Sequence, residues 1–512
     1  MKKFIFLFTL FISHQILFSQ TEEIPEKITQ KGFAKIDFLS IDMPITNILN
    51  EPNMGFTGIH YNLLFNEIFY TGVGIYGSVT GSRGGFFTLG INAGIKKYFS
   101  DSFYLDTGFH FGGGGGAGAP DGGGAFILPH FNLGYDFKNF SINSGWSYVN
   151  FFDNGNIKGN QLNVSLEIPL DFEYADYSSS EKEFNLESLQ KTNWNKNSNR
   201  ISLMLHLNNL TIKGTSKDTN GKLYNGEVIR LAGFEIASYF NKNWFGFLKV
   251  DGAFDGIDAG YMDVFFGAGY HLSMNKNRTN ILAKFGIGAG GGGGVDTKGG
   301  VLIYPDISLE QKIFNDIYIS INKGYVMSPG NYFSTSSFGV GLKYYMEKDG
   351  IIKQNKNYNQ SKFKGIDVIL KQDLYFNAKR MTNKTENMHQ ISLQVNLDLN
   401  KNIFISGQTS FANFGNAGAY AEGLVGVGLK TKPFYNDSLS FYTQFLGGAA
   451  GGGNISTGQG LIIKPSLGLD YMLNNTLNLR FSGGYVKAKG GELSSPFINL
   501  GIKYNISLLK LK

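Results

Sequence analysis

Residues 112–124 read GGGGGAGAPDGGG, and nine of these thirteen residues are glycine. Fixing such a run costs more backbone entropy than fixing almost any other sequence. Three interpretations are open: a disordered linker, a phosphate-binding loop, or a hairpin that the fold requires. The surroundings of the run decide between them.

The same arrangement occurs three times along the chain. Residues 108–137, 284–314 and 444–473 each contain an aromatic segment, a glycine run, a turn, more glycine, an apolar triplet and a proline. A Gly-aromatic pair follows each proline after 16 to 19 residues. The period, roughly 160–175 residues, is too long for a solenoid unit and predicts a domain-sized module present three times. The marker residues of these repeats are Pro129, Pro305, Pro465, Gly145, Gly324 and Gly484.

A nucleotide site is the sharpest alternative for the glycine runs. Gly286, Gly288 and Gly291 match the GxGxxG pattern. A dinucleotide site needs a helix directly after the glycines and an acidic residue about 20 positions further on. Another strand pattern follows here, and no Walker A sequence is present. We therefore expect no cofactor, and a glycine-rich hairpin between two strands remains.

Alternation of apolar and polar residues dominates the rest of the chain. In residues 162–174 one face carries leucine, valine, isoleucine and aromatic side chains, and the other carries Asn163, Ser165 and Glu167. Such a period of two indicates strands. Turn signals divide each module into eight segments, which predicts about 24 strands. Connections are alternately very short and longer, an asymmetry that outer-membrane barrels show.

The polar face of these strands is lined by small groups. Strand 85–99 carries Thr88, Gly90, Asn92 and Gly94 on that face. A face open to water would more often carry lysine and glutamate, whereas small groups suit a confined interior. The apolar face is therefore predicted to meet lipid. A soluble secreted β protein remains the alternative.

The N-terminus carries an export signal. MKKFIFLFTLFISHQILFSQ has two lysines, a short apolar core and a small residue at Ser19, which predicts a signal peptide over residues 1–19. No later segment has 18 consecutive apolar residues, so no transmembrane helix is expected. The net charge of +6 is scattered over the chain, so we expect no nucleic-acid partner. There is no cysteine.

These features together resemble the bacterial outer-membrane β-barrel proteins, in particular the small eight-stranded, up-and-down type repeated in tandem. The resemblance covers roughly residues 30–510 and includes closing strands such as FINLGIKYNISL. It implies an all-β, antiparallel transmembrane barrel fold, the outer membrane of a Gram-negative-type bacterium, and outer-membrane lipid and the barrel-insertion machinery as partners. The chain departs from the pattern by ending in Leu511-Lys512 instead of an aromatic residue.

Three modules and two connectors follow from the repeats. Barrel repeats are predicted at residues 30–177, 200–346 and 364–512, with linkers at 178–199 and 347–363. The strands could close once, as a wide pore, or three times, as small filled barrels. The long polar linkers favour three closures. The partner of the strand at residues 32–42 discriminates, since pairing with 160–174 means separate barrels and pairing with 496–509 means one.

Candidates for chemistry are few. His110 and His130 lie on neighbouring predicted strands either side of a turn, so they are the only candidate pair for a metal or for a lipid-modifying enzyme. We expect no catalytic residues. A set of acidic residues on inner faces is expected to pair with Lys96, Lys343 or Lys503: Glu167, Asp171, Asp306, Glu310 and Asp470.

The predicted function is that of a non-enzymatic outer-membrane barrel with an envelope-structural or small-pore role. Three alternatives stay open: a single 24-stranded pore or polymer export channel, a lipid-modifying outer-membrane enzyme, and a soluble secreted β protein. An extracellular ligand or envelope partner is not identified by any motif.

Overall fold

The structure, a computed structural model, describes residues 24–44, 51–214, 216–224, 226–352 and 359–512. The predicted signal peptide, residues 1–19, lies outside the described residues. The described part is all-β, as predicted, apart from four short helical turns. These turns are η1 (Tyr177–Ser179), α2 (Leu186–Leu189), η2 (Asn275–Asn277) and η3 (Pro329–Asn331). None of the helices in the described ranges is long and apolar enough to cross a membrane.

The first eight-stranded barrel is closed. Its first strand, β2, pairs antiparallel with β3 on one side and with β9 on the other, where Phe33 faces Pro169 and Leu39 faces Asn163. The strand at 32–42 therefore pairs with the segment at 160–174, the outcome predicted for separate closure. We call this barrel the first ring: β2 (Gly32–Ile41), β3 (Met54–Leu64), β4 (Phe69–Thr80), β5 (Phe87–Tyr98), β6 (Phe103–Gly115), β7 (Phe126–Asp136), β8 (Ser141–Phe151) and β9 (Lys158–Pro169).

The strands that follow form a second closed set. β12 pairs with β13 and also with β19, from Asn199 opposite Lys348 to Ile212 opposite Thr335. We call these strands the second ring: β12 (Asn199–Ile212), β13 (Val228–Tyr239), β14 (Trp244–Asp255), β15 (Met262–Met274), β16 (Thr279–Gly291), β17 (Val301–Lys312), β18 (Ile317–Met327) and β19 (Ser334–Lys348).

The last strands pair in the same way. β20 pairs with β21 and also with β27, from Ser361 opposite Leu511 to Tyr375 opposite Phe497. A single 24-stranded barrel is therefore not what the described strands form, and the wide-pore alternative is wrong. We call these strands the third ring: β20 (Gln360–Lys379), β21 (Thr385–Asp398), β22 (Ile403–Phe414), β23 (Ala421–Lys430), β24 (Leu439–Gly451), β25 (Leu461–Met472), β26 (Leu477–Ala488) and β27 (Ser494–Leu511).

Each ring turns its polar face inward. On β9, Asn163, Ser165 and Glu167 are buried, whereas Leu162 is 78% exposed and Val164 46% exposed. Side chains alternate across a strand, so one face of every strand lines the interior and the other faces outward. The faces predicted from the sequence are confirmed, and the outward face is the apolar one.

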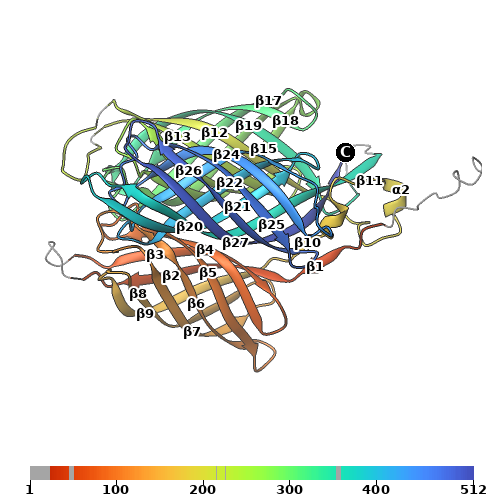
Figure 1. Cartoon of the computed structure of the whole chain (residues 1–512), viewed down its shortest axis with the longest axis horizontal. Coiled ribbons are helices and arrows are strands. Elements are labelled where there is room, and N and C mark those ends of the chain that lie inside the picture. The colour runs from red at the N-terminus through yellow and green to blue at the C-terminus, as the bar shows by residue number, and fades with distance from the viewer. Residues whose placement is uncertain (1–23, 45–50, 215, 225, 353–358) are drawn as a thin grey trace, which may run out of the picture.

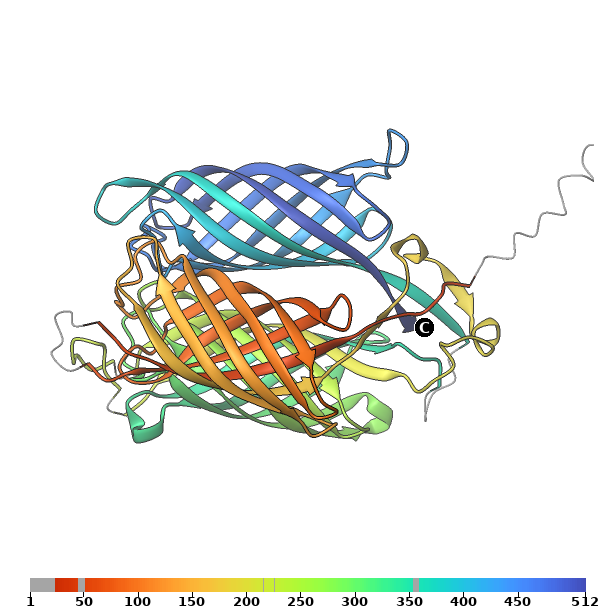
Figure 2. The ribbon, with the colours of Figure 1, turned by 90° about the horizontal axis from the view of Figure 1, so that it is seen from below.

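The two ends of the rings differ. Short turns such as residues 65–68 and 137–140 join strands at one end, which we call the turn end, and longer loops such as 116–125 and 292–300 join them at the other, the loop end. The rings lie side by side, and the C-terminus lies at the turn end (Figure 2).

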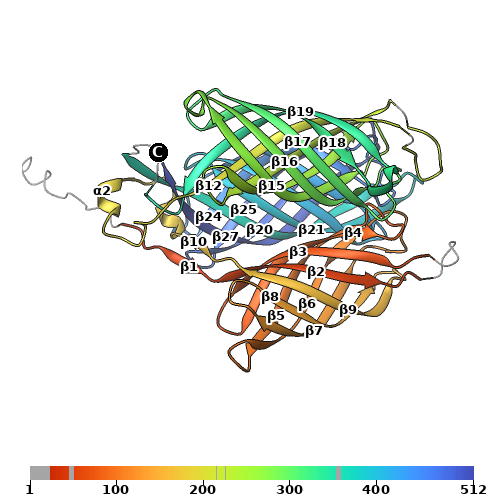
Figure 3. The same cartoon turned by 180° about the vertical axis from the view of Figure 1, so that it is seen from behind.

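A small cap covers part of the turn end. It includes β1 (Ile28–Gln30), β10 (Phe172–Tyr174), β11 (Glu183–Asn185), η1 and α2. Trp194 is fully buried in it against Phe184, Phe363 and Leu509. The cap thus ties the segment before the first ring, the connections between rings and the chain end to one apolar cluster (Figures 1 and 3).

One prediction is wrong: the segment at residues 160–174 does not form a single strand, and Asp171 does not lie inside the ring. Strand β9 ends at Pro169, and β10 pairs with β1 outside the ring instead of continuing β9 to residue 174. Asp171 is consequently exposed, and its carboxylate accepts a hydrogen bond from the Gly32 amide at 3.2 Å. The alternation continues through 171–174, so periodicity alone could not show where the strand leaves the ring.

The marker prolines occupy matching places in the three rings. Each lies on the sixth strand, in a gap of the pairing with the seventh strand, because proline has no N–H to donate. A Cβ on Gly324 would lie 2.3 Å from the Pro305 carbonyl oxygen, and one on Gly484 would lie 2.2 Å from that of Pro465. A Cβ on Gly145 would lie 2.1 Å from the Phe131 carbonyl oxygen.

Candidate functional site

Ion pairs cross the interior of the first ring. Lys35 Nζ lies 3.2 Å from Asp106 Oδ2, and Lys96 Nζ lies 2.6 Å from Glu167 Oε2. The Tyr104 hydroxyl donates to the same Glu167 oxygen at 3.0 Å. Glu167 thus pairs with Lys96, one of the three lysines expected as partners of the inner acidic residues. No sequence pattern indicates the pairing of Lys35 with Asp106, whose strands are not neighbours in the sheet.

One carboxylate organises the second ring. Glu235 accepts from Lys284 at 2.7 Å and from Lys343 at 3.4 Å. Lys284 also lies 3.2 Å from Asp306, and Lys343 lies 3.0 Å from Glu310. Glu310 thus pairs with Lys343, one of the three lysines expected, whereas Asp306 pairs with Lys284, which is not among them.

The third ring contains the strongest pair by geometry. Arg480 donates from Nε and Nη2 to the two oxygens of Asp470 at 2.6 and 2.7 Å, a bidentate arrangement. Its guanidinium carbon lies 3.8 Å from the centre of the Tyr442 ring. Lys503, one of the three lysines expected as partners, lies 3.0 Å from Asp470 and 3.2 Å from Asp367.

These charged groups are shielded from water. A water-filled lumen would leave the side chains that line it accessible, and unpaired buried charges would be very costly. The interiors are instead filled by paired side chains. None of the following is more than 8% exposed: Lys35, Lys96, Asp106, Glu167, Glu235, Lys284, Asp306, Glu310, Lys343, Asp367, Asp470, Arg480 and Lys503.

The two candidate histidines both lie in the first ring but take separate partners. His110 is buried, and its Nδ1 lies 2.5 Å from Asn92 Oδ1. His130 Nε2 lies 3.3 Å from Asp106 Oδ2 and from the Tyr70 hydroxyl. Within the described residues, histidine, aspartate and glutamate side chains form no group of three that could hold a metal ion.

The three rings contact one another through equivalent strands. The third strand of each ring packs on the fifth strand of another: β4 on β16, β14 on β24, and β22 on β6. The first ring therefore contacts the second, the second contacts the third, and the third contacts the first. This is a head-to-tail arrangement that closes into a cycle of three.

The glycine-rich hairpins form these contacts. The Gly84 amide donates to the Lys298 carbonyl at 2.7 Å, and the Gly418 amide donates to the Gly122 carbonyl at 3.0 Å. At the remaining contact, a Cβ on Gly451 would lie 2.4 Å from the Gly260 nitrogen. Backbone meets backbone in all three places, and glycine is the residue that permits this approach.

An acidic residue holds the hairpin of the first ring in shape. Asp121 Oδ2 accepts from the Gly116 amide at 2.8 Å, and the side chain is 7% exposed. Burial raises the pKa of Asp121 to about 7, although the backbone hydrogen bond from Gly116 and the nearby Arg83 act in the opposite direction. This loop carboxyl therefore titrates close to neutral pH.

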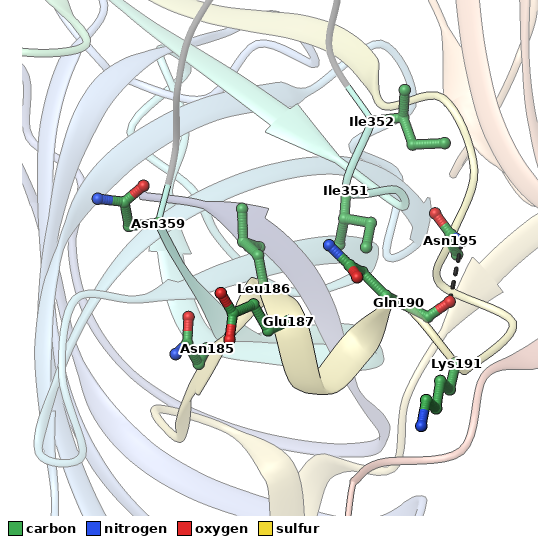
Figure 4. A pocket seen from close by; sticks show the side chains of 9 residues that line it. All are labelled: Asn185, Leu186, Glu187, Gln190, Lys191, Asn195, Ile351, Ile352 and Asn359. Atoms are coloured by element: carbon green, nitrogen blue, oxygen red, sulfur yellow. Dashed lines mark hydrogen bonds between the residues drawn. The ribbon is translucent and has the colours of Figure 1, made fainter.

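A pocket of about 810 Å³ lies on the cap (Figure 4). Side-chain amides supply most of its polar lining, and the Asn195 amide donates to the Gln190 carbonyl at 2.9 Å. Glu187 and Lys191 are its charged members, and both are exposed. Its lining brings together no pair of acid and base that could carry a reaction. The lining residues are Asn185, Leu186, Glu187, Gln190, Lys191, Asn195, Ile351, Ile352 and Asn359.

Comparison with known proteins finds structural similarity between this chain and solved structures. No protein-family model and no curated protein matches the chain. OpdQ of Pseudomonas aeruginosa is 8% identical, with 94% of this chain and 98% of that chain covered and a TM-score of 0.22. The ferric enterobactin receptor PfeA of the same organism, in complex with enterobactin, is 9% identical, with coverages of 93% and 81% and a TM-score of 0.28.

A smaller protein matches only part of the chain. The Yersinia pestis outer membrane protein Ail, in a phospholipid bilayer nanodisc, is 16% identical, with 29% of this chain and 99% of that chain covered and a TM-score of 0.20. TM-scores this low do not define a shared architecture. The filled interiors and the contacts between rings are therefore the features from which function is inferred.

Proposed function

We propose that this chain is a non-enzymatic β-barrel protein of the outer membrane, in which three copies of one eight-stranded module form a closed, envelope-structural unit. Filled interiors carry the proposal, since ion pairs that exclude water leave no path for solute. A small-pore role has less support for the same reason. The proposed location is the outer membrane of a Gram-negative-type bacterium, with lipid and the barrel-insertion machinery as partners.

The outer surface supports membrane insertion. Large contiguous apolar surface is rare on soluble proteins, and an apolar outer band is the mark of transmembrane barrels. All three rings expose such side chains, so the soluble secreted alternative has less support. Examples at least 40% exposed are Phe131, Leu133, Leu162, Phe285, Ile307, Leu309, Val427, Phe445 and Leu467.

Equivalent details in the three rings support a repeated module. Each ring has its proline in the same gap between its sixth and seventh strands, and each uses its third and fifth strands for contact. A lipid-modifying enzyme has less support, because His110 and His130 take separate partners inside a filled ring.

Conductance tests the structural role. The full chain, reconstituted in a planar lipid bilayer, should give no conductance steps. The double variant Asp470→Ala with Arg480→Ala removes one buried anion and one buried cation together, so its interior charge stays balanced while the bidentate pair is lost. Steps from this variant alone would show that the pair seals the third ring. Steps from the unaltered chain would refute the closed unit.

Fractionation tests the location separately. The protein should be extracted only with detergent and should migrate faster in SDS gels before heating than after it, as closed barrels do. Recovery in a detergent-free soluble fraction would refute membrane insertion.

A further inference from the structure

An apolar cavity of about 260 Å³ lies between the first and second rings. Its walls are outward faces of β2 to β5 in the first ring and of β15 to β17 in the second. Among its lining side chains only Thr57 and Tyr76 carry polar atoms, and the Tyr76 hydroxyl donates to Asp37 inside the first ring at 2.7 Å. No charged residue lines it.

Water is a poor occupant for this cavity. An apolar cavity of roughly 150 Å³ lined by leucine, isoleucine and phenylalanine stays dry and binds apolar molecules. The cavity here is larger and similarly lined, and a water inside it would lack the two to four polar partners that a buried water needs. An apolar occupant is therefore required for good packing.

The cavity continues into surface that lipid would cover. Phe38 and Ile287 line it and are 52% and 46% exposed, so it opens onto the outer bands of the two rings. Its loop end is closed, because Gly84 and Lys298 are hydrogen-bonded backbone to backbone there. A flexible chain could enter from the bilayer and end against this contact.

We propose that this cavity, a groove open toward the membrane, binds one acyl chain of a lipid from the surrounding membrane. The bound chain is a permanent part of the interface between the first and second rings. The proposal rests on the proposed membrane insertion. The bound chain fills the space between β4 and β16, next to the backbone hydrogen bond that joins Gly84 and Lys298. Dispersion contacts with Ile59, Ile75 and Val79 on one side and Val264 and Ala289 on the other hold it.

Native mass spectrometry of the detergent-solubilised full chain tests this. We expect one lipid molecule to stay bound to the unaltered protein after the detergent and loosely bound lipids are removed. Thr57→Phe places a ring in the cavity and should lower the ratio of lipid-bound to lipid-free protein by roughly tenfold, the effect of about 1.4 kcal/mol. Thr107→Phe makes the same change on the exposed outer face of β6 and should leave this ratio unchanged.

Equal lipid-bound fractions in all three proteins, or no bound lipid in the unaltered protein, would overturn the proposal. So would a stable dimer mass, which would identify a second copy as the occupant. A density map of the unaltered chain in a lipid nanodisc needs no variant and should show a rod of density in the groove. Because fractionation reports membrane insertion by itself, a membrane protein with an empty groove would refute only the bound lipid.

Discussion

A methyl group added at Gly113 should weaken the contact between the third ring and the first. Gly113 lies on β6 with an ordinary extended backbone, so alanine introduces no conformational strain. Its Cβ would lie 2.4 Å from the Ala412 carbonyl oxygen and 2.7 Å from Asn413 Cβ, both on β22 of the third ring. The substitution therefore acts on the contact between rings and not on the first ring itself.

The size of the effect follows from these distances. Ordinary van der Waals contact begins near 3.4 Å, so the two strands must move apart by about 1 Å. A gap of 0.5–1 Å loses a quarter to a half of the dispersion energy across a contact, and overpacking costs typically ~1–3 kcal/mol. Alanine also restricts the unfolded chain, which offsets about 0.4–1 kcal/mol. A net weakening of about 1–2 kcal/mol remains.

The absence of cysteine makes the contact easy to measure. Asn154 of the first ring donates to Asn416 of the third ring at 3.3 Å, so Asn154→Cys with Asn416→Cys places two thiols across this contact and nowhere else. A short bifunctional thiol reagent should join them. Gly113→Ala should slow this cross-linking by about tenfold, the equivalent of ~1.4 kcal/mol.

Gly407→Ala is the matched control. Gly407 lies on β22, the strand that carries Ala412, and an added Cβ would meet nothing within 4 Å. This variant should cross-link at the rate of the parent. If Gly113→Ala also cross-links at that rate, close approach of the two backbones is not the reason for glycine at this place, and the hairpins must hold the rings together in another way.

Three further outcomes are expected. Burial raises the pKa of Asp121 from 3.8 in the unfolded chain to about 7. The protonated carboxyl therefore stabilises the hairpin fully below about pH 4, and this stabilisation is lost as the pH rises through 7. Hydrogen exchange of the Gly116 amide should show this pH dependence, and Asp121→Asn should abolish it. Arg480→Met removes one partner of the buried Asp470 carboxylate and should lower the free energy of unfolding by about 3–5 kcal/mol. The folded barrel, recognised by its heat-modifiable migration in SDS gels, should then be lost at a lower urea concentration. An unchanged midpoint would show that Lys503 alone suffices for Asp470. Trp194→Ala should lower the stability of the cap by about 3–5 kcal/mol. Residues 170–199 should then be cleaved by protease while the rings stay resistant. Cleavage no faster than in the parent would contradict a packed cap.

Strands and their faces could be predicted from the sequence because the underlying signals are local. A period of two places Asn163, Ser165 and Glu167 on one face whatever the rest of the chain does. Short polar turns then mark where each strand ends. Alternation that outlasts the strand misleads, as Asp171 shows, because β10 leaves the ring while its residues still alternate.

Partners across a ring could not be predicted, because they depend on the tilt and stagger of strands that are distant in the chain. Glu235 serves two lysines that are 49 and 108 residues away in the sequence. The alternating pattern placed such residues inside, but it could not assign one cation to one anion. The bidentate pair of Arg480 and Asp470 joins neighbouring strands, yet only the side-chain geometry shows its strength.

The contacts between rings depend on how whole rings are placed relative to one another, which no local sequence pattern encodes. Nothing in the sequence near Gly113 indicates that a carbonyl of residue 412 faces it. The cycle nevertheless explains why all three modules carry a glycine-rich hairpin at their contacts, although Ala289 and Ala449 stand where the first ring has Gly113. In a head-to-tail cycle each ring presents one strand of each kind, so every hairpin meets the same kind of backbone surface. Linking the rings in one chain raises their effective concentration, and two contacts and the cap persist when one contact is opened. A single Gly113→Ala change should therefore loosen one contact without dissociating the unit, which is why the test must be read at Asn154 and Asn416 and not from global stability.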